Sequence, residues 1–530
     1  MSLNPFSKLL LASILSFAIS CQVPQSSSED PSSNSRPNII YILTDDLGYG
    51  DLSCFNPNGK IQTPHIDDIA RQGMIFTDAH TTSSVCTPSR YSILTGRYSW
   101  RTRLKEGVLT GKSKALVPNS RRTLASMLSS HGYHTAFLGK WHLGWDWALK
   151  DSSEFGGSGW SESDFDNLDF TRNVTNTPND LGFDLAYGHS GSLDMAPYVY
   201  VQNGEITALP DRVTVDTGQY TWWRQGPTGS DFVHEDVTPG LFRRSMAYIQ
   251  ARAGTAEPFF LYLALPSPHT PILPSDKWVG KSGLNYYGDF VMMIDDYIGQ
   301  LHQTLIQAGI EDETMIIFTS DNGCSPEANF ELLDSLGHHP SHIYRGHKAD
   351  IYEGGHRVPF IVKWPGKIAP RSINNNTIST TDFYATCAAM LGYSMEPDEG
   401  EDSFNMLSLL TSSSKTTFDR VSTVHHSING SFAIRRGKWK LIMCPGSGGW
   451  SYPTPKDINQ MDTFIPAQLY DLEADPGEKS NVYELHPGVV EDLGQELISI
   501  IDNGRSTVGP VQENDYYSGE WHQREFSFLK

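Results

Sequence analysis

Short apolar runs alternate with helical patterns along most of this chain, and this alternation restricts the folds open to it. The run NIIYIL at 38–43 is rich in β-branched residues and has no strongly polar position after Asn38, which is typical of a strand buried on both faces. Comparable runs occupy 135–139, 259–265, 314–320 and 359–364. A long amphipathic pattern at 286–310 indicates a helix between two of them. The sequence therefore predicts an α/β fold with a mostly parallel sheet flanked by helices.

The character of the sequence changes after about residue 410. Stretches such as SFAIRRGKWKLIM suggest short antiparallel strands joined by turns, followed by a terminal helix near VVEDLGQELISIIDNG. We expect a main α/β domain over 36–410 and a smaller α+β subdomain, built on a short antiparallel sheet, over 411–530. Residues 150–240 are rich in Gly, Asp, Ser and Trp, and are interpreted as long insertions over one edge of the main sheet.

The first 35 residues are expected to lie outside the fold. Lys8 precedes the apolar stretch 9–20, and Cys21 follows it, which is the pattern of an export signal too short to span a membrane comfortably. We therefore predict a signal peptide at 1–20 and a Ser/Pro-rich tether at 21–35. The cysteine after FAIS resembles a bacterial lipoprotein cleavage box. This favours a lipoprotein of the periplasm or cell surface, anchored at Cys21, with ordinary secretion as the alternative.

Charge and cysteine content exclude several classes of function. The formal net charge of −21 argues against a nucleic-acid partner, which would require a broad basic face. Apart from Cys21 and Cys86, the cysteines are scattered and lack CxxC spacing, so a zinc cage is disfavoured. Export permits disulfides, but the sequence selects no pairing among Cys54, Cys324, Cys387 and Cys444.

Polar side chains follow four of the predicted strands. They are Asp45 and Asp46, Lys140 and His142, His269, and Asp321 and Asn322. Because the carboxyl ends of parallel strands meet at one edge of a sheet, these residues are expected to share a site. The oxygen donors among them suit calcium or magnesium better than zinc.

The stretch SSVCTPSRYSILTG at 83–96 places Cys86 at the start of a predicted helix. Pro88 fits the first turn of a helix, where backbone amides favour negative charge, and Arg90 lies about one turn further on. A buried or an activated thiol would explain the cysteine alone. Neither explains the proline and the arginine at this spacing.

These segments resemble the type I sulfatase family. SVCTPSRYSILTG resembles its C-x-P-x-R signature, and GYHTAFLGKWH at 132–142 resembles its second signature, with Leu138 where a smaller or β-branched residue is more usual. The likeness extends over PNIIYILTDDLGYGDL, PSPHTP, TSDNG, GHKADIYEGGHRVPFIVKWPG and LYDLEADPGEKSNV, and so covers most of 36–485. The segment GHSGSLDM resembles the arylsulfatase A and N-acetylgalactosamine-6-sulfatase branch. The resemblance implies an alkaline-phosphatase-like α/β domain.

The resemblance also implies a mechanism. In this family the cysteine, here Cys86, is oxidised to formylglycine, which acts as its hydrate and contributes to a calcium site. Asp45, Asp46, Asp321 and Asn322 would supply the remaining calcium ligands. One hydroxyl of the hydrate would attack sulfur while Asp321 takes its proton, and His269 would protonate the leaving alcohol. His142 would then deprotonate the second hydroxyl, which expels sulfate.

Other residues would bind rather than transfer protons. Arg90 and Lys140 would hold the formylglycine, and Lys348 would neutralise a sulfate oxygen. Ser192 is the candidate beside the sulfate, with His189 and Ser190 as competitors. In the histidine-rich stretch 336–348, a second metal site is one reading, and we favour Arg345 and His347 as contacts to substrate. The basic residues Arg97, Arg101, Arg103 and Lys105 would face either an anionic sugar chain or solvent.

The prediction is thus an exported, calcium-dependent sulfatase acting on a sulfated mono- or oligosaccharide, with 6-O-sulfated galactose or N-acetylgalactosamine favoured. Its partners would be this substrate and a formylglycine-generating maturation enzyme, with no nucleic acid, and membrane contact only through a lipid anchor at Cys21. The alternatives are a phosphatase or phosphodiesterase of the same superfold, and a non-catalytic lipoprotein that binds sulfated glycans.

Overall fold

The computed structural model describes residues 36–151, 165–411, 418–515, 522–524 and 526. Residues 36–530 form one compact unit. The predicted signal peptide and tether, including Cys21, lie outside the described residues. Among the described helices, none is both long and apolar enough to cross a membrane. The five cysteines of the described part, Cys54, Cys86, Cys324, Cys387 and Cys444, are all free.

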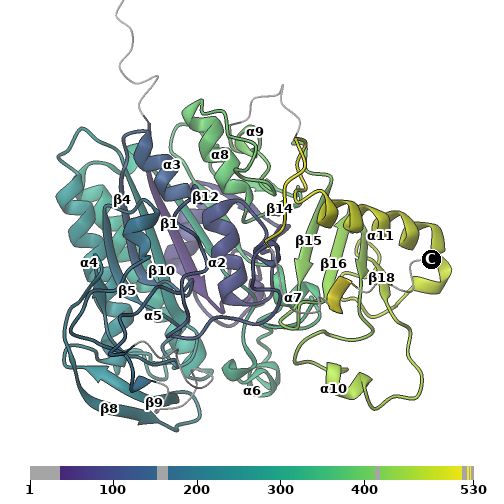
Figure 1. Cartoon of the computed structure of the whole chain (residues 1–530), viewed down its shortest axis with the longest axis horizontal. Coiled ribbons are helices and arrows are strands. Elements are labelled where there is room, and N and C mark those ends of the chain that lie inside the picture. Colours follow the sequence, from purple (N-terminus) through teal and green to yellow (C-terminus); the bar gives the residue numbers. More distant parts are fainter. Residues whose placement is uncertain (1–35, 152–164, 412–417, 516–521, 525, 527–530) are drawn as a thin grey trace, which may run out of the picture. The chain divides into compact units, whose positions relative to one another are not determined.

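A ten-stranded sheet forms the centre of this unit (Figure 1). Its strands, in spatial order, are β13 (Ser372–Asn374), β2 (Met74–Phe76), β12 (Phe360–Lys363), β11 (Thr314–Ser320), β1 (Asn38–Asp45), β10 (Phe259–Pro268), β4 (His134–Lys140), β5 (Leu185–His189), β6 (Val201–Gln202) and β7 (Glu205–Ile206). The five strands from β11 to β5 are mutually parallel. Strands β12 and β6 run antiparallel to their core neighbours. The predicted α/β class with a mostly parallel sheet is confirmed.

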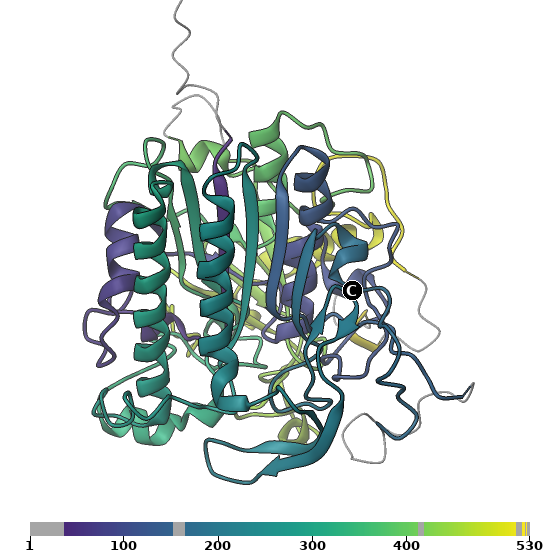
Figure 2. The same ribbon diagram turned by 90° about the vertical axis from the view of Figure 1, so that its left-hand side faces the viewer.

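The central strands are buried on both faces, as their apolar sequences predicted. Every residue of β1, β10 and β11 is buried. Helices on the two sides of the sheet account for this (Figure 2). On one side lie α1 (Pro64–Gln72), α4 (His234–Arg252) and α5 (Tyr286–Ala308), and on the other lie α2 (Cys86–Thr95), α3 (Leu124–Ser130) and α8 (Asp382–Leu391).

Local sequence explains where the longest helix begins and ends. The side chain of Asn285 accepts a hydrogen bond from the backbone N–H of Gly288 and so caps the N-terminus of α5. Gly309 ends the helix at φ +70°, a left-handed conformation that glycine adopts without steric cost. The predicted helix at 286–310 therefore has the expected closing glycine.

A second, antiparallel sheet follows in the chain. It contains β15 (Ser422–His426), β16 (Phe432–Arg436), β17 (Trp439–Ile442) and β18 (Gln468–Asp471), and α11 (Pro487–Asp502) packs against β16 and β17 (Figure 1). Apolar residues of α11, including Leu493, Leu497 and Ile501, are buried. This confirms the expected short antiparallel strands and terminal helix. The helix α9 (Leu407–Leu410) ends at the predicted domain boundary, which stays a prediction.

The expectation of insertions over 150–240 was partly wrong. Strand β5 belongs to the parallel core, where it pairs with β4. Its sequence, LAYGH, is short and ends in Gly188 and His189, so only pairing with β4 reveals it as a strand. The ribbon of β8 (Pro210–Asp216) and β9 (Trp223–Gly229) is separate from the main sheet, as an insertion would be.

Candidate active site

Cys86 is the first residue of α2, directly after the N-cap residue Val85. Its side chain is buried, and burial raises the pKa of the thiol to about 12, although Lys140 and Lys348 oppose the shift. An unmodified Cys86 is therefore a neutral thiol at physiological pH. The loop before Cys86 is bonded to the antiparallel sheet, because the backbone N–H of Ser84 donates to the backbone carbonyl of His426, in β15, at 3.1 Å.

The predicted acidic residues converge at the carboxyl ends of two adjacent parallel strands. Asp45 is the last residue of β1, and Asp46 follows it at φ +65°. Asp321 and Asn322 come directly after β11, which pairs with β1. Asn322 Nδ2 donates to Asp46 Oδ1 at 2.6 Å, and the backbone N–H of Asp46 donates to Asp321 Oδ1 at 3.3 Å.

The donor set fits a hard divalent cation such as calcium. One ligand atom from each of Asp45, Asp46, Cys86 and His269 lies within 4.8 Å of the other three. Asp45 Oδ1 and Asn322 Oδ1 are buried and have no hydrogen-bond partner among the described residues. Buried oxygens are rarely left without a donor, so these two are suited to a metal ion.

Three basic side chains balance the three carboxylates. Arg90 Nε donates to Asp321 Oδ2 at 2.8 Å, Lys140 Nζ donates to Asp45 Oδ2 at 2.5 Å, and Lys348 Nζ donates to Asp46 Oδ2 at 2.8 Å. Burial favours a neutral Asp45, but Lys140 and the other nearby positive groups hold the pKa of that carboxyl well below its usual range. Burial and the charge of Asp45 raise the pKa of Asp321 to about 6. With the side chains in their usual ionic forms, a bound cation would leave a net positive charge for an anion to neutralise.

In two histidines of the site, one ring nitrogen donates a hydrogen bond to a backbone carbonyl, and the other nitrogen takes no part in that bond. His142 donates from Nε2 to the carbonyl of Leu109 at 2.8 Å, and its buried Nδ1 has no partner among the described residues. Burial, reinforced by Lys140, lowers the pKa of His142 well below its ordinary value, so the ring is neutral and its Nδ1 carries a free lone pair. His269 donates from Nδ1 to the carbonyl of Thr270 at 2.6 Å, and its Nε2 lies 3.7 Å from Asp46 Oδ2.

Some of these groups line a cavity of about 280 Å³. Of the predicted site residues, Cys86, His142, Ser192, His269 and Lys348 form part of its wall. The wall also contains residues that sequence reasoning did not identify, among them Asp194, Trp222, Arg224, Glu327 and Trp450. Asp194 stands two residues after Ser192, in a segment already noted. No local pattern marks the others, which come from distant parts of the chain.

The structure separates the remaining predicted substrate residues from this cavity. His189 and Ser190 are buried but do not line it. Arg345 donates to the hydroxyl of Tyr470 and the carbonyl of Glu478, and its guanidinium stacks on Tyr352. Arg345 and His347 instead line a different hollow of about 380 Å³. A role for these residues in binding substrate stays a prediction.

The basic residues of 97–105 do not together form a surface that faces a sugar chain or solvent. Arg97, Arg101 and Lys105 are buried. Arg97 pairs with Glu401, and Arg101 pairs with Asp402. Only Arg103 is exposed, and it donates to the carbonyls of Lys114 and Ala115. The acidic partners lie about 300 residues away in the sequence, so charge pattern alone could not reveal them.

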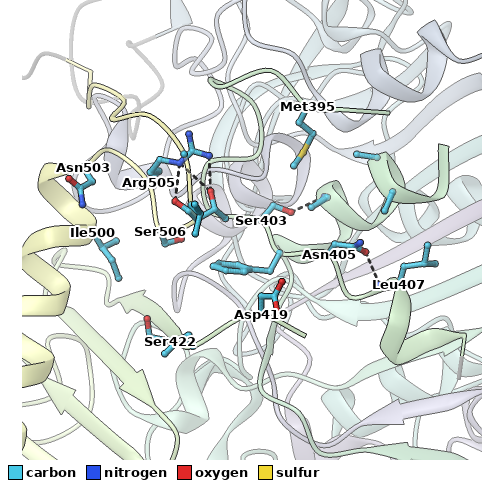
Figure 3. Close-up of a pocket in the computed structure, with 18 of the residues that line it drawn as sticks. Met395, Ser403, Asn405, Leu407, Asp419, Ser422, Ile500, Asn503, Arg505 and Ser506 are labelled. Carbon is cyan, nitrogen blue, oxygen red and sulfur yellow. Dashed lines mark hydrogen bonds between the residues drawn. The ribbon is translucent and has the colours of Figure 1, made fainter. Parts of the chain in front are cut away.

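A larger hollow lies elsewhere in the described part of the chain (Figure 3). It has a volume of about 1320 Å³ and lies between the segment after α8, with Met395 and Ser403, and the segment at the end of α11, with Arg505 and Ser506. None of the predicted catalytic residues lines it. Size alone therefore does not mark the candidate active site.

Comparisons with known proteins agree with the geometry. The sequence model of the sulfatase family matches residues 37–393, and that of the N-sulphoglucosamine sulphohydrolase C-terminal region matches 345–503. The N-acetylgalactosamine-6-O-sulfatase of Bacteroides thetaiotaomicron is 35% identical over 504 residues, which cover 88% of this chain and 93% of that protein. Human arylsulfatase A is 32% identical over 495 residues, covering 90% of each chain.

A solved structure shows the same likeness in three dimensions. Its title concerns the metabolism of multiple glycosaminoglycans by Bacteroides thetaiotaomicron. It superposes with a TM-score of 0.75 at 34% identity and covers 88% of this chain and 99% of the other. Because the family match spans well over half of the sequence and the fold agrees, this chain belongs to the sulfatase family and is a sulfatase.

Proposed function

We propose that this sulfatase removes sulfate from a sulfated carbohydrate, with 6-O-sulfated galactose or N-acetylgalactosamine as the favoured substrate. The observation that carries the proposal is the charge-balanced cluster around Cys86 at the wall of a small cavity. The cavity volume of about 280 Å³ is near the lower limit of about 300 Å³ for common ligand sites, which suits one sugar unit. The named activity of the 35% identical relative supports the choice of sugar.

The proposal requires oxidation of Cys86 to formylglycine by a maturation enzyme. The raised pKa of the buried thiol supports it, because a neutral thiol is a weak nucleophile at this position. Formylglycine, as its hydrate, supplies two hydroxyl groups on one carbon, one to attack sulfur and one whose proton can be removed to release sulfate. A serine at position 86 would lack the second hydroxyl.

Calcium is the proposed metal ion. Asp45, Asp46, Asp321 and Asn322, together with modified residue 86, would hold it, and the unpartnered oxygens of Asp45 and Asn322 support this assignment. The ion would supply positive charge that binds and polarises the sulfate group. With Lys348 nearby on Asp46, the cavity would be strongly attractive to a sulfate ester anion.

The side chains around the cavity can move the protons that hydrolysis requires. His269 has Nδ1 committed to a carbonyl, so its Nε2 is the atom that would protonate the leaving alcohol. His142 is neutral, with Nδ1 available to take the proton whose removal releases sulfate. Asp321 would accept the proton of the attacking group. Arg90 and Lys140 would hold residue 86 and these carboxylates in place.

We further propose that the protein is exported and reaches the bacterial periplasm or cell surface. The signal-like residues 1–20 and the cysteine at position 21 support a lipid-anchored form. Residues 36–410 would then form the catalytic domain and 411–530 the C-terminal subdomain. The bond between Ser84 and His426 supports a contribution of that subdomain to the active site.

Release of free sulfate from defined sugars tests the proposed function. The panel contains galactose and N-acetylgalactosamine sulfated at single positions, together with an aryl sulfate and an aryl phosphate. The enzyme is supplied with calcium after the Cys86 peptide has been confirmed by mass as the aldehyde. We expect sulfate release from a 6-sulfated sugar, none from Cys86→Ala, and no phosphate release. Hydrolysis of the aryl sulfate without any sugar would refute the substrate class.

A further inference from the structure

Asp194 lines the same cavity as Cys86 and His269, and one of its carboxylate oxygens, Oδ1, is buried. The residue is only 3% exposed, and its Oδ1 has no hydrogen-bond partner among the described residues. His269 Nδ1 lies 4.0 Å from this oxygen, beyond hydrogen-bonding distance. A buried acceptor left without a donor costs free energy, so its presence at a ligand cavity points to a donor on the ligand.

The β8–β9 ribbon holds this carboxylate in one orientation. Arg224, near the start of β9, donates its backbone N–H to the carbonyl of Asp194 at 3.2 Å. Its guanidinium also donates to Asp194 Oδ2 and forms an ion pair with it. Because Oδ2 is bonded in this way, Oδ1 is the oxygen that remains for a ligand.

The position of Asp194 is on the leaving-group side of the cavity. His269, the proposed proton donor to the leaving alcohol, lies between Asp46 and Asp194, with one ring nitrogen near each carboxylate. The alcohol in the proposed reaction is the sugar itself. Trp222 and Trp450 line the same cavity and offer flat apolar surfaces for a sugar ring.

We propose that Asp194, oriented by Arg224, determines specificity by accepting a hydrogen bond from a ring hydroxyl of the sulfated sugar. The inference rests on the proposed function and deepens it, because it requires a substrate with a free ring hydroxyl beside the sulfated position. A role in orienting His269 is less consistent with the geometry, since His269 Nδ1 already donates to the carbonyl of Thr270 at 2.6 Å.

Asp194→Asn is the informative variant. Arg224 can only donate, so the new amide would turn its oxygen toward Arg224 and its NH2 toward the cavity. The exposed atom would thereby change from an acceptor to a donor at nearly constant volume. Asp236→Asn is the matched control, because Asp236 forms a similar pair with Arg243 on the exposed surface of α4.

Sulfate release is measured with the methyl glycoside of N-acetylgalactosamine 6-sulfate and with its 3-deoxy and 4-deoxy analogues. We expect Asp194→Asn to lower kcat/KM on the parent sugar about 10- to 100-fold. On the analogue that lacks the recognised hydroxyl, the wild type should fall by a similar factor, and the variant should match the wild type within about threefold. Asp236→Asn should match the wild type on all three sugars.

The outcomes separate this inference from the proposed function. Equal losses for Asp194→Asn on the parent and on both analogues would show a role through His269 or the fold, and would overturn the inference. Wild-type activity of this variant on the parent sugar would also overturn it. If the wild type releases sulfate from a different sugar of the panel, the same comparison is made with deoxy analogues of that sugar. Release from no sugar would refute the proposed function, and the Asp194 inference with it, before any variant is compared.

Discussion

Replacing Arg101 with methionine should destabilise the protein strongly, although the side chain lies outside the candidate active site. Arg101 is fully buried and donates from Nε and Nη2 to both oxygens of Asp402 at 2.8 Å. It also donates from Nη2 to the carbonyl of Ile500 at 3.1 Å, at the end of α11. The guanidinium thus connects the segment after α2 with the C-terminal helix.

The cost follows from the charge that would remain. Removing one partner of a buried ion pair typically costs about 3–5 kcal/mol, because the other charge is left uncompensated in a low-dielectric site. For a unit of about 500 residues, the entropy of unfolding is roughly 1 kcal/mol per degree. We therefore expect the apparent Tm of Arg101→Met to fall by about 3–5 °C in differential scanning calorimetry.

Two further variants make the reasoning refutable. Arg243→Met removes an exposed partner of Asp236, where ion pairs contribute about 0–1 kcal/mol, so its Tm should stay within about 1 °C of the wild type. Arg101→Met combined with Asp402→Asn should lose less stability than the sum of the single variants, because no isolated charge remains. If Arg101→Met has the same Tm as Arg243→Met, the argument from an uncompensated charge is wrong. It is also wrong if the loss of stability in the double variant equals the sum of the losses in the two single variants.

Three other results are expected. His142→Gln, which can still donate to the carbonyl of Leu109 but has no basic nitrogen, should lower kcat about 10²- to 10⁴-fold with an unchanged Tm; wild-type turnover would exclude His142 as the base. Removing calcium with EGTA should abolish sulfate release and lower the Tm, since an ion at 100 times its Kd stabilises by about 2.7 kcal/mol, and an unchanged Tm would argue against the site at Asp45. Burial and nearby positive groups lower the pKa of His425 well below its ordinary value. Below about pH 6.5, the unfolded state therefore takes up a proton that the native state does not. As a result, this residue lowers the stability of the protein by roughly 1.4 kcal/mol for each pH unit of decrease. The Tm of His425→Phe should therefore fall less between pH 7.5 and 5.5 than that of the wild type, and equal slopes would contradict the assignment.

The fold class was readable from the sequence because the strands of the parallel core carry their own signal. The continuous apolar runs of β1, β10 and β11 have no polar face, and only a sheet covered on both sides buries such runs. Strand β5 shows the limit of that signal. Its five residues resemble the loop around them, and their pairing with β4 is a long-range fact that no local pattern carries.

The candidate site was readable for a similar reason. The parallel sheet brings the carboxyl ends of β1, β4, β10 and β11 to one edge, so the residues that follow these strands converge. Asp45, Cys86 and His269 were accordingly predicted from position and motif, and the structure brings their ligand atoms close together. Their chemical roles stay predictions.

The residues of the cavity wall that the sequence did not identify could be found only from the tertiary structure. Asp194, Arg224 and Trp450 lie in loops and in a ribbon whose positions are set by packing rather than by periodicity. Arg101 shows the same limit. Its basic stretch suggested an exposed surface, but in the folded protein Arg101 forms a buried ion pair with Asp402. The sequence by itself determined the α/β class and the candidate residues around Cys86, because strand patterns and motifs are local. Which charges are buried, and which side chains close the cavity around a substrate, only the tertiary structure decided, because those contacts join segments far apart in the chain.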